Sequence, residues 1–384
     1  MDFLFNQEQR ELKKKVIKLC EEKLAPLEEK VGESKVMSHE IAEVLAESGL
    51  FKLFVPAQYG NTTAMPSLVS VCLAREELAR RCPNAELIFV MQGLGSYPIV
   101  LSGNHALQAK YCPLIASGEK IFTLCLTEPN AGSDVGAMET TAVKDGDQWV
   151  LDGQKIFTSL APDADIYTVF AKTDPEQGTR GISAFVVEKG FDGFDPGKRM
   201  DLMAAHPIGA PVFKECPVPR ENMIGELNAG FKVSMQNLDF FRSTVGSAAV
   251  GMAQAALDEA LSYAKSRIQF GKSISEFQGI QFKLADMATR VEAARGLLYR
   301  AALAYDAQEA RKRKLSSMAK LNASDAATWV TRQAVQIFGG YGYSWEYPVE
   351  RLFRDAKVTE IYEGTSEIHR IIIARELYLE RGND

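Results

Sequence analysis

The sequence has 384 residues, which is too many for one ordinary hydrophobic core, so we expect two or three domains. The apolar fraction of 46% and the charged fraction of 24% exclude a disordered or fibrous chain. A net charge of −6 favours solubility and gives no reason to expect nucleic acid or an anionic membrane as a partner. No apolar run reaches the roughly 20 residues that cross a bilayer, so membrane insertion is not expected.

The cysteines indicate reduced thiols in a cytoplasmic protein. None of the six forms a C-x-x-C pair, and no Cys/His cluster has the spacing of a zinc site, so no metal is expected. The first residues, Met1-Asp2-Phe3, lack a charged leader before an apolar stretch, and a secretory signal is therefore not expected.

Residues 1–118 have the period of helices. Apolar residues recur at intervals of three and four between Gln7 and Lys23, and Pro26 is expected to end that helix or to lie just beyond it. Ser38 is a candidate N-cap for a second helix. Two more helices are predicted over residues 67–81 and 85–101.

Residues 119–225 change to the alternation of strands. Residues 140–151 read as a hairpin, because Asp145-Gly146 supplies the positive φ angles of a tight turn. Further strands, rich in Val, Ile, Phe and Tyr, are predicted over residues 166–172, 181–188 and 211–216. Five or six short strands predict a small β-barrel or sandwich.

Residues 226–384 return to the helical period. Long helices are predicted over residues 245–270, 278–307, 315–338 and 366–379, and four such helices fit a bundle. The basic run Arg311–Lys314 is interpreted as a solvated turn between two of them. The order of helices, strands and helices predicts an α+β chain of several domains, since a Rossmann fold would alternate the two.

The segment Leu126–Asp134, L-T-E-P-N-A-G-S-D, could bind a ligand. Pro129 and Gly132 enforce a defined loop, and Gly132 permits close approach of a ligand to the backbone. Thr127 and Ser133 offer donors to a heteroaromatic ring or a phosphate. The residues alone favour a structural turn over a ligand-binding loop.

The segment Ile361–Ser366 precedes the last predicted helix, with Thr365 or Ser366 as its cap. A carboxylate such as Glu363, beside glycine and apolar neighbours, can be partly desolvated, which makes it a better base near neutral pH. A capping acid that stabilises the helix dipole is the alternative.

The segment Arg267–Gly271 offers an arginine at the end of a long helix, where it could pair with a pyrophosphate or simply mark the helix end. Two glycine-containing motifs that bind nucleotides, the P-loop and the dinucleotide-binding motif, are excluded. Ser266 stands where a P-loop before Lys272-Ser273 needs glycine, and Gly93-Leu94-Gly95 lacks the third glycine of a dinucleotide fold.

Four segments in this order resemble the acyl-CoA dehydrogenase family over residues 5–379. They are residues 126–134, 267–271 with Gln278, 336–342 (Q-I-F-G-G-Y-G) and 361–365 (I-Y-E-G-T). The resemblance implies an N-terminal helical domain (1–118), a middle β-domain (119–225) and a C-terminal four-helix bundle (226–384). It also implies FAD as cofactor, bound at a subunit interface of a homotetramer.

The resemblance assigns a role to each matching residue. Glu363 matches the catalytic base, and Phe241 occupies the other position at which some members carry the base. The implied substrate contacts are Ser133, Asp239, Arg242, Tyr362 and Gly364. The implied FAD contacts are Leu126, Thr127, Gly132, Ser133, Phe157, Ser159, Arg267, Gln269, Phe270, Gln278, Gln336, Gly339, Gly340, Thr365 and Glu367.

The implied reaction is α,β-dehydrogenation of an acyl-CoA, in which Glu363 takes the α-proton, the β-hydride passes to the flavin, and an electron-transferring flavoprotein accepts the electrons. The bulk of Met91, Gln92 and Phe241 favours a short, branched or cyclic acyl group over a long chain. Enoyl-CoA reduction, an acyl-CoA or nitroalkane-type oxidase, and a scaffold without chemistry are the alternatives.

The sequence departs from the family pattern in three places. Residues 157–161 (F-T-S-L-A) replace a common Trp-Ile-Thr-Asn-Gly beside the flavin. Residues 204–206 (A-A-H) replace an Arg, a small residue and Ser, so a cation is lost from a loop of the β-domain. Glu367 replaces a common Gln at a flavin contact.

Overall fold

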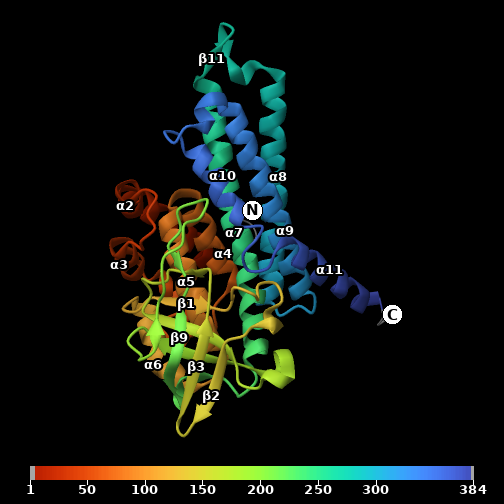
Figure 1. Cartoon of the computed structure of the whole chain (residues 1–384). Coiled ribbons are helices and arrows are strands. Elements are labelled where there is room, and N and C mark those ends of the chain that lie inside the picture. Colours follow the sequence, from red (N-terminus) through yellow and green to blue (C-terminus); the bar gives the residue numbers. More distant parts are fainter. Residues whose placement is uncertain (1–4, 382–384) are drawn as a thin grey trace. The chain divides into compact units, whose positions relative to one another are not determined.

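The computed structural model describes residues 5–381, which form two compact units (Figure 1). Among the described residues, the first unit draws on residues 5–25, 68–83 and 239–381, and the second on residues 26–67 and 84–238. Helices and one two-stranded hairpin make up the first unit, whereas the second combines helices with a larger sheet. The predicted α+β class with a central sheet and C-terminal helices is confirmed. The domain boundaries at residues 118 and 225 stay predictions.

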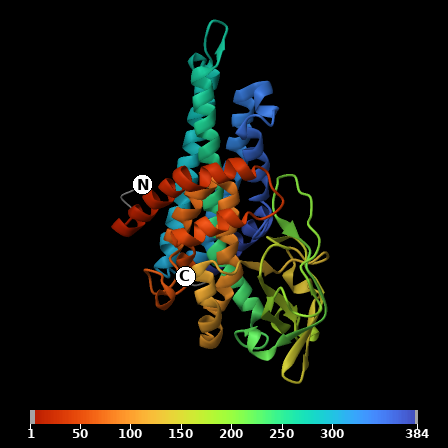
Figure 2. The ribbon, with the colours of Figure 1, turned by 90° about the vertical axis from the view of Figure 1, so that its left-hand side faces the viewer.

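Long helices dominate the first unit, and α7, α8 and α9 run side by side in both views (Figures 1 and 2). Residues 278–307 and 315–338 were predicted as helices and are helical in the structure. The helices of this unit are α1 (Gln7–Leu19), α4 (Leu68–Arg81), most of α7 (Gly230–Ser266), α8 (Gln278–Asp306), α9 (Lys312–Phe338), α10 (Pro348–Val358) and α11 (Ser366–Arg381). Helix α10 was not predicted from the sequence.

The first predicted helix is wrong at its end. The chain passes from α1 through a π-helical turn at Cys20–Leu24 into α2 (Ala25–Val31). Pro26 lies in the first turn of α2, where a missing amide proton costs no intrahelical hydrogen bond. Proline therefore continues the helical path here instead of ending it.

The helix predicted to reach Phe270 ends four residues earlier, at Ser266. A two-stranded hairpin follows, in which β11 (Ile268–Gln269) pairs with β12 (Lys272–Ser273). Phe270 and Gly271 form its turn with φ angles of 54° and 79°. Consecutive positive φ angles match a tight hairpin turn and are incompatible with a right-handed helix.

The basic run Arg311–Lys314 is not a solvated turn, because α9 begins within it at Lys312. Lys314 is buried and its ammonium pairs with Glu380 of α11. Arg313 lies 3.8 Å from Asp239 and 3.7 Å from Glu376. The buried Lys314 and the half-buried Arg313 thus pair with acidic residues that are far away in the sequence.

The second unit contains an eight-stranded mixed sheet in the order β10-β6-β5-β2-β3-β9-β7, with β1 parallel to β5. The predicted hairpin is confirmed as β2 and β3, with Gly146 at φ 57°. The strands are β1 (Phe122–Cys125), β2 (Thr141–Asp145), β3 (Gln148–Gln154), β5 (Ile166–Lys172), β6 (Ile182–Glu188), β7 (Phe194–Asp195), β9 (Val212–Pro219) and β10 (Met223–Ile224). A separate pair is β4 (Thr158–Ser159) with β8 (Ile208–Gly209).

Helices α3 (His39–Ser48), α5 (Pro83–Leu101) and α6 (His105–Ser117) belong to the same unit. Ser38 caps α3 as predicted, by accepting a hydrogen bond from the amide of Ile41. At Gly95, a Cβ would lie 2.5 Å from the backbone nitrogen of Thr123. The glycine-rich stretch of α5 therefore allows this helix to pack closely against β1, and no dinucleotide is needed to explain it.

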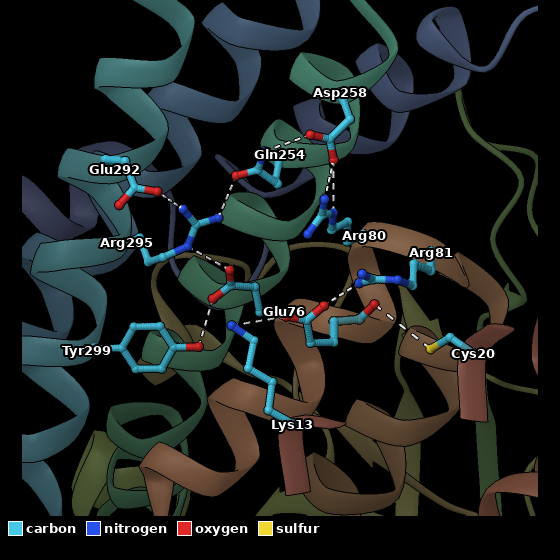
Figure 3. A network of polar contacts seen from close by, with 11 residues as sticks. Lys13, Cys20, Glu76, Arg80, Arg81, Gln254, Asp258, Glu292, Arg295 and Tyr299 are labelled. Carbon is cyan, nitrogen blue, oxygen red and sulfur yellow. Dashed lines mark hydrogen bonds and ion pairs between the residues drawn. The ribbon is translucent and has the colours of Figure 1, made fainter. Parts of the chain in front are cut away.

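A polar network joins four helices of the first unit (Figure 3). Arg295 of α8 donates to Glu76 of α4 at 2.8 Å and to Gln254 of α7 at 2.9 Å. The buried Tyr299 hydroxyl donates to the other oxygen of Glu76 at 2.7 Å. Lys13 of α1 lies 3.6 Å from Glu77. These contacts satisfy charges that the helices bury.

Candidate functional site

The turn between α10 and α11 carries the predicted base. Glu363 has a φ of 52° and Gly364 a φ of 101°, so two successive residues adopt left-handed or related conformations. Such a conformation costs a non-glycine residue roughly 1 kcal/mol or more and occurs most often at functional sites. The turn is closed by a hydrogen bond of 3.0 Å from the amide of Ser366 to the carbonyl of Glu360. The Glu363 side chain is half-buried.

Cations from two helices hold the backbone of this turn. Arg242 of α7 donates from Nε to the carbonyl oxygen of Glu363 at 3.4 Å, and its Nη1 lies 2.6 Å from Asp239. Lys320 of α9 donates from Nζ to the carbonyl oxygen of Gly364 at 2.8 Å. The structure therefore brings four predicted residues together: Asp239, Arg242, Glu363 and Gly364.

Burial shifts the pKa values of the ionisable groups around this turn. It raises the pKa of the Asp239 carboxyl above its usual value, against the opposing effect of Arg242. It lowers the pKa of Lys320 to about 8 and that of His369, on α11, to about 3. His369 packs against the turn, because a Cβ on Gly364 would lie 3.3 Å from its Nε2 atom.

The start of α11 holds two more predicted residues. The hydroxyl of Thr365 accepts a hydrogen bond of 3.4 Å from the amide of Ile368, as a helix cap does. Glu367 is exposed in the first turn, where hydrogen bonds from the helix backbone and from Thr365 lower its carboxyl pKa. Tyr362 precedes the base and is half-buried.

A second group of predicted residues lines a cavity of about 610 Å³ at the hairpin end of the first unit. Arg267 and Gln269 contribute from the end of α7 and from β11, and Gly339 and Gly340 follow α9. A Cβ on either glycine would meet no atom within 4 Å, so the backbone there is open to a ligand. Arg267 also lies over the Tyr341 ring, 5.3 Å from its centroid.

Three residues predicted near this cavity are exposed and do not line it: Phe270, Gln278 and Gln336. Phe270 is 94% exposed at the tip of the hairpin. Gln278 begins α8, and Gln336 lies in the last turn of α9.

The predicted flavin-ring loop belongs to the second unit. Backbone hydrogen bonds of 3.0 and 3.2 Å between Glu128 and Ala131 close a tight turn around Pro129. Leu126 and Thr127 are half-buried before this turn, and Gly132 and Ser133 are exposed after it. The loop thus exposes the backbone of Gly132 and the hydroxyl of Ser133, and both could contact a ligand.

A buried ion pair anchors this loop. Lys155 is fully buried, and its Nζ atom lies 2.6 Å from Glu128. Burial acts to raise the pKa of the Glu128 carboxyl, but Lys155 and the amides of Glu139 and Thr140 outweigh it, and the net shift is downward. No role was predicted for Glu128 or Lys155, although Glu128 lies within the segment 126–134.

Phe157 and Ser159 lie near each other on the same unit. Phe157 is 53% exposed at a φ of 53°. The Ser159 hydroxyl is 2.8 Å from Nε2 of His206, and the Ser159 carbonyl accepts a hydrogen bond of 2.5 Å from the Thr123 hydroxyl. His206 is one of the residues that depart from the expected pattern, so the departure is physically linked to a predicted flavin contact.

Family models cover nearly the whole chain. They describe the N-terminal, middle and C-terminal domains of acyl-CoA dehydrogenase and match residues 6–119, 123–216 and 228–378. An acyl-CoA dehydrogenase of Bacillus subtilis is 43% identical over 97% of this chain and 98% of its own. The chain belongs to the acyl-CoA dehydrogenase family.

Two further acyl-CoA dehydrogenases are similar over their full lengths. A cyclohexane-1-carbonyl-CoA dehydrogenase of Geobacter metallireducens is 39% identical, covering 98% of this chain and 99% of its own. The solved butyryl-CoA dehydrogenase of Megasphaera elsdenii is 40% identical, with a TM-score of 0.94 over 98% of this chain and 100% of that one. This acyl-CoA dehydrogenase is accordingly an oxidoreductase and a flavoprotein.

FAD is the cofactor of the family and of this chain. The cavity beside Arg267 fits such a ligand, because an arginine and two open glycines are groups that can approach phosphates closely. Among the residues that the structure describes, no cluster of three or more potential metal ligands occurs and no helix is long and apolar enough to cross a membrane.

The prediction that the bulk of Gln92 limits the acyl group is not supported by its contacts. Its amide donates to the carbonyls of Ile115 and Lys120 and accepts from the amide of Phe122. All of these groups are backbone atoms that link α5 to α6 and β1, so Gln92 holds the fold of the second unit. Its size is therefore no argument about the acyl group.

Proposed function

We propose that this acyl-CoA dehydrogenase introduces an α,β double bond into a short, branched or cyclic acyl-CoA, with Glu363 as the base. The observation that carries the proposal is the turn at Glu363, whose carbonyl is bound by Arg242 and whose following carbonyl is bound by Lys320. A base must be held in one geometry to attack a weakly acidic carbon, and two cations from different helices restrain its backbone.

The chain's own residues have separate tasks in this proposal. FAD, when bound, supplies the acceptor of the β-hydride. Glu363 removes the α-proton from the substrate and carries it as a neutral carboxyl. Arg242 and Asp239 orient the substrate and the turn, and Tyr362 and Gly364 border the thioester. Thr365 and Glu367 are expected to contact FAD after the base.

The remaining residues that are expected to contact FAD fall into two groups. Arg267, Gln269, Gly339 and Gly340 are assigned to its phosphate-bearing part, because they line an open cavity with a cation. Phe270, Gln278 and Gln336 are expected to complete that contact from the surface of a neighbouring copy. The flavin ring is assigned to residues of the second unit, namely Leu126, Thr127, Gly132, Ser133, Phe157 and Ser159.

The acyl group is assigned from the similarity to relatives and from the bulk of two buried side chains. The relatives act on a cyclic acyl group in one case and are named for butyryl-CoA in another. Met91 and Phe241 are buried and bulky, which is consistent with a compact acyl group, although they belong to different units. We further propose an electron-transferring flavoprotein as electron acceptor, and a cytoplasmic location.

Anaerobic flavin reduction tests the proposal. Butyryl-CoA, isobutyryl-CoA, cyclohexane-1-carbonyl-CoA and palmitoyl-CoA are mixed separately with the yellow enzyme, and the loss of flavin absorbance is followed. We expect a compact acyl-CoA to bleach the flavin and the Glu363→Gln variant to bleach it at least about 1000-fold more slowly, since general-base catalysis alone contributes factors of this order. An unchanged rate in the variant, with normal FAD content, would refute the assignment of the base.

The electron acceptor needs a separate assay. The reduced enzyme is mixed with purified electron-transferring flavoprotein or with air-saturated buffer. Rapid reoxidation by the flavoprotein, with little hydrogen peroxide in air, is the expected result. Stoichiometric peroxide would instead indicate an oxidase.

A further inference from the structure

Lys320 is a buried cation next to the proposed base. It lies on α9, its side chain is 0% exposed, and its Nζ atom donates to the Gly364 carbonyl at 2.8 Å. In the part of the chain that the structure describes, no carboxylate lies within 4.0 Å of that nitrogen. A carbonyl oxygen carries only a partial negative charge. The ammonium of Lys320 therefore has no close counter-ion among the described residues.

Burying such a group has a cost to the fold. The loss of hydration lowers the pKa of Lys320 to about 8, which means that burial disfavours its charged form. A methionine of similar length would fill the same space and avoid this cost. Packing alone therefore gives no reason for an ammonium at this position.

Among the opposite charges, that of Glu363 acts most strongly on Lys320. The carboxylate of Glu363 is the strongest electrostatic influence that favours the charged form of Lys320, ahead of Glu360 and Asp325. The interaction is mutual, because a cation that is stabilised by a carboxylate stabilises that carboxylate equally. Lys320 thus contacts the turn through its hydrogen bond and the base through its field.

We propose that Lys320 is a positioning residue that fixes the Glu363–Gly364 turn and keeps the Glu363 carboxyl ionised before proton abstraction. The inference rests on the proposed role of Glu363 as the base. Lys320 touches neither substrate nor reacting atoms in this proposal. Its ammonium acts through the Gly364 carbonyl and through the charge that it places behind the base.

Other charged groups face Lys320 and contribute to the same field. They are Arg242 from α7, Glu360 and Glu363 from the turn, Asp325 from α9, and Glu367 and His369 from α11. Arg242 and Lys320 are both coupled electrostatically to Glu363, and Glu360 and Asp325 favour the charged form of Lys320. His369 is neutral above a pH of about 3 and adds no charge near neutrality.

A pair of variants on one helix tests this role. Lys320→Met removes the ammonium beside Glu363. Lys314→Met removes another buried ammonium of α9, which pairs with Glu380 and is the matched control. The rate of anaerobic flavin reduction by saturating butyryl-CoA is measured from pH 5.5 to 9.5 in the FAD-loaded enzyme, or by cyclohexane-1-carbonyl-CoA if that substrate is faster.

We expect the acid limb of the rate profile to move to higher pH by about one unit in Lys320→Met, because a neighbouring cation lowers a carboxyl's proton affinity by about this much or more. The maximal rate should fall roughly 10-fold or more while the substrate concentration at half-maximal rate changes little. The profile of Lys314→Met should match the parent. Lys320→Arg, which keeps its charge at high pH, should retain the acid limb of the parent.

A second readout does not depend on turnover. Hydrogen exchange of the backbone amides in residues 360–366 should accelerate at least several-fold in Lys320→Met and stay unchanged in Lys314→Met. Unfolding in urea at pH 7 should show that Lys320→Met is no less stable than the parent, since the buried charge is gone. Identical pH profiles and identical exchange in the two variants would overturn the inference.

The outcome separates two failures. Glu363→Gln is measured in the same series. If Glu363→Gln still reduces the flavin at the parental rate, the proposed function fails. If Glu363→Gln is inactive while Lys320→Met has the parental profile and parental exchange, only the role of Lys320 fails.

Discussion

Burial changes the pKa values of individual ionisable side chains, and His369 is the clearest case. His369 lies inside the first unit with an exposed fraction of 0%, and burial together with Lys320 and Arg242 lowers its pKa from 6.5 to about 3. Between pH 6.5 and about 3, His369 is therefore neutral in the folded protein and protonated in the unfolded chain. Because the unfolded state binds more protons between pH 6.5 and about 3, stability increases with pH across that window and is lost on acidification.

Replacing this histidine should reduce the acid sensitivity of the fold. Between pH 6.5 and 4.5 the buried ring accounts for a loss of about 2 to 3 kcal/mol in the free energy of unfolding. His369→Gln should lose correspondingly less over the same interval. Urea unfolding of parent and variant at pH 7.5, 6.5, 5.5 and 4.5 measures the difference. Parallel losses in both proteins would mean that the histidine is already protonated in the folded state.

At the scale of elements, long-range ion pairs fix how helices meet in the first unit. Arg295 is largely buried and joins α8 to α4 through Glu76, whereas Arg300, about one turn further along α8, pairs with Glu309 at the surface. The two arginines differ chiefly in solvent exposure. A buried pair leaves an uncompensated charge when one partner is removed, and a surface pair is replaced by water.

The two arginines should therefore respond differently to methionine. Arg295→Met leaves Glu76 buried without its cationic partner and should reduce the free energy of unfolding by about 3 kcal/mol. Arg300→Met should have no measurable effect. Equilibrium urea unfolding, followed by circular dichroism, gives both values. A similar loss in the two variants would contradict the importance of burial.

At the scale of the whole molecule, the first unit exposes large apolar side chains that a monomer would leave in water. Trp345 is 89% exposed after α9, Phe270 lies at the hairpin tip, and Tyr378 lies near the end of α11. Figure 1 shows the C-terminal end of α11 extending away from the other helices of its unit. Exposed aromatic residues of this kind mark protein interfaces, in agreement with the proposed homotetramer.

A charge in this surface should weaken assembly. Trp345→Glu should shift the protein toward smaller species, since a buried interface tryptophan often contributes about 2 kcal/mol or more. Val143→Glu alters an exposed apolar residue of β2 in the second unit and serves as control. Sedimentation velocity at several protein concentrations distinguishes the species. Equal masses for Trp345→Glu and the parent would place Trp345 outside any interface.

Much of the fold could be predicted because it is encoded locally. A period of 3.6 residues or of two is a property of neighbouring side chains, so most long helices and the β2–β3 hairpin were found. The errors occur where a local signal is ambiguous. A proline such as Pro26 can end a helix or begin one. Phe270 adopts a positive φ angle, which its residue type does not predict.

The candidate site divides in the same manner. The sequence alone indicated that Glu363 and Gly364 precede the last helix, and the resemblance to the family assigned the roles of Glu363, Gly339 and Gly340. Only the tertiary structure decided which cations surround that turn. Lys320 is 44 positions from Gly364 and Arg295 is 219 positions from Glu76. Such pairs form only when packed helices bring distant residues within hydrogen-bonding distance, and no local pattern of side chains specifies that arrangement.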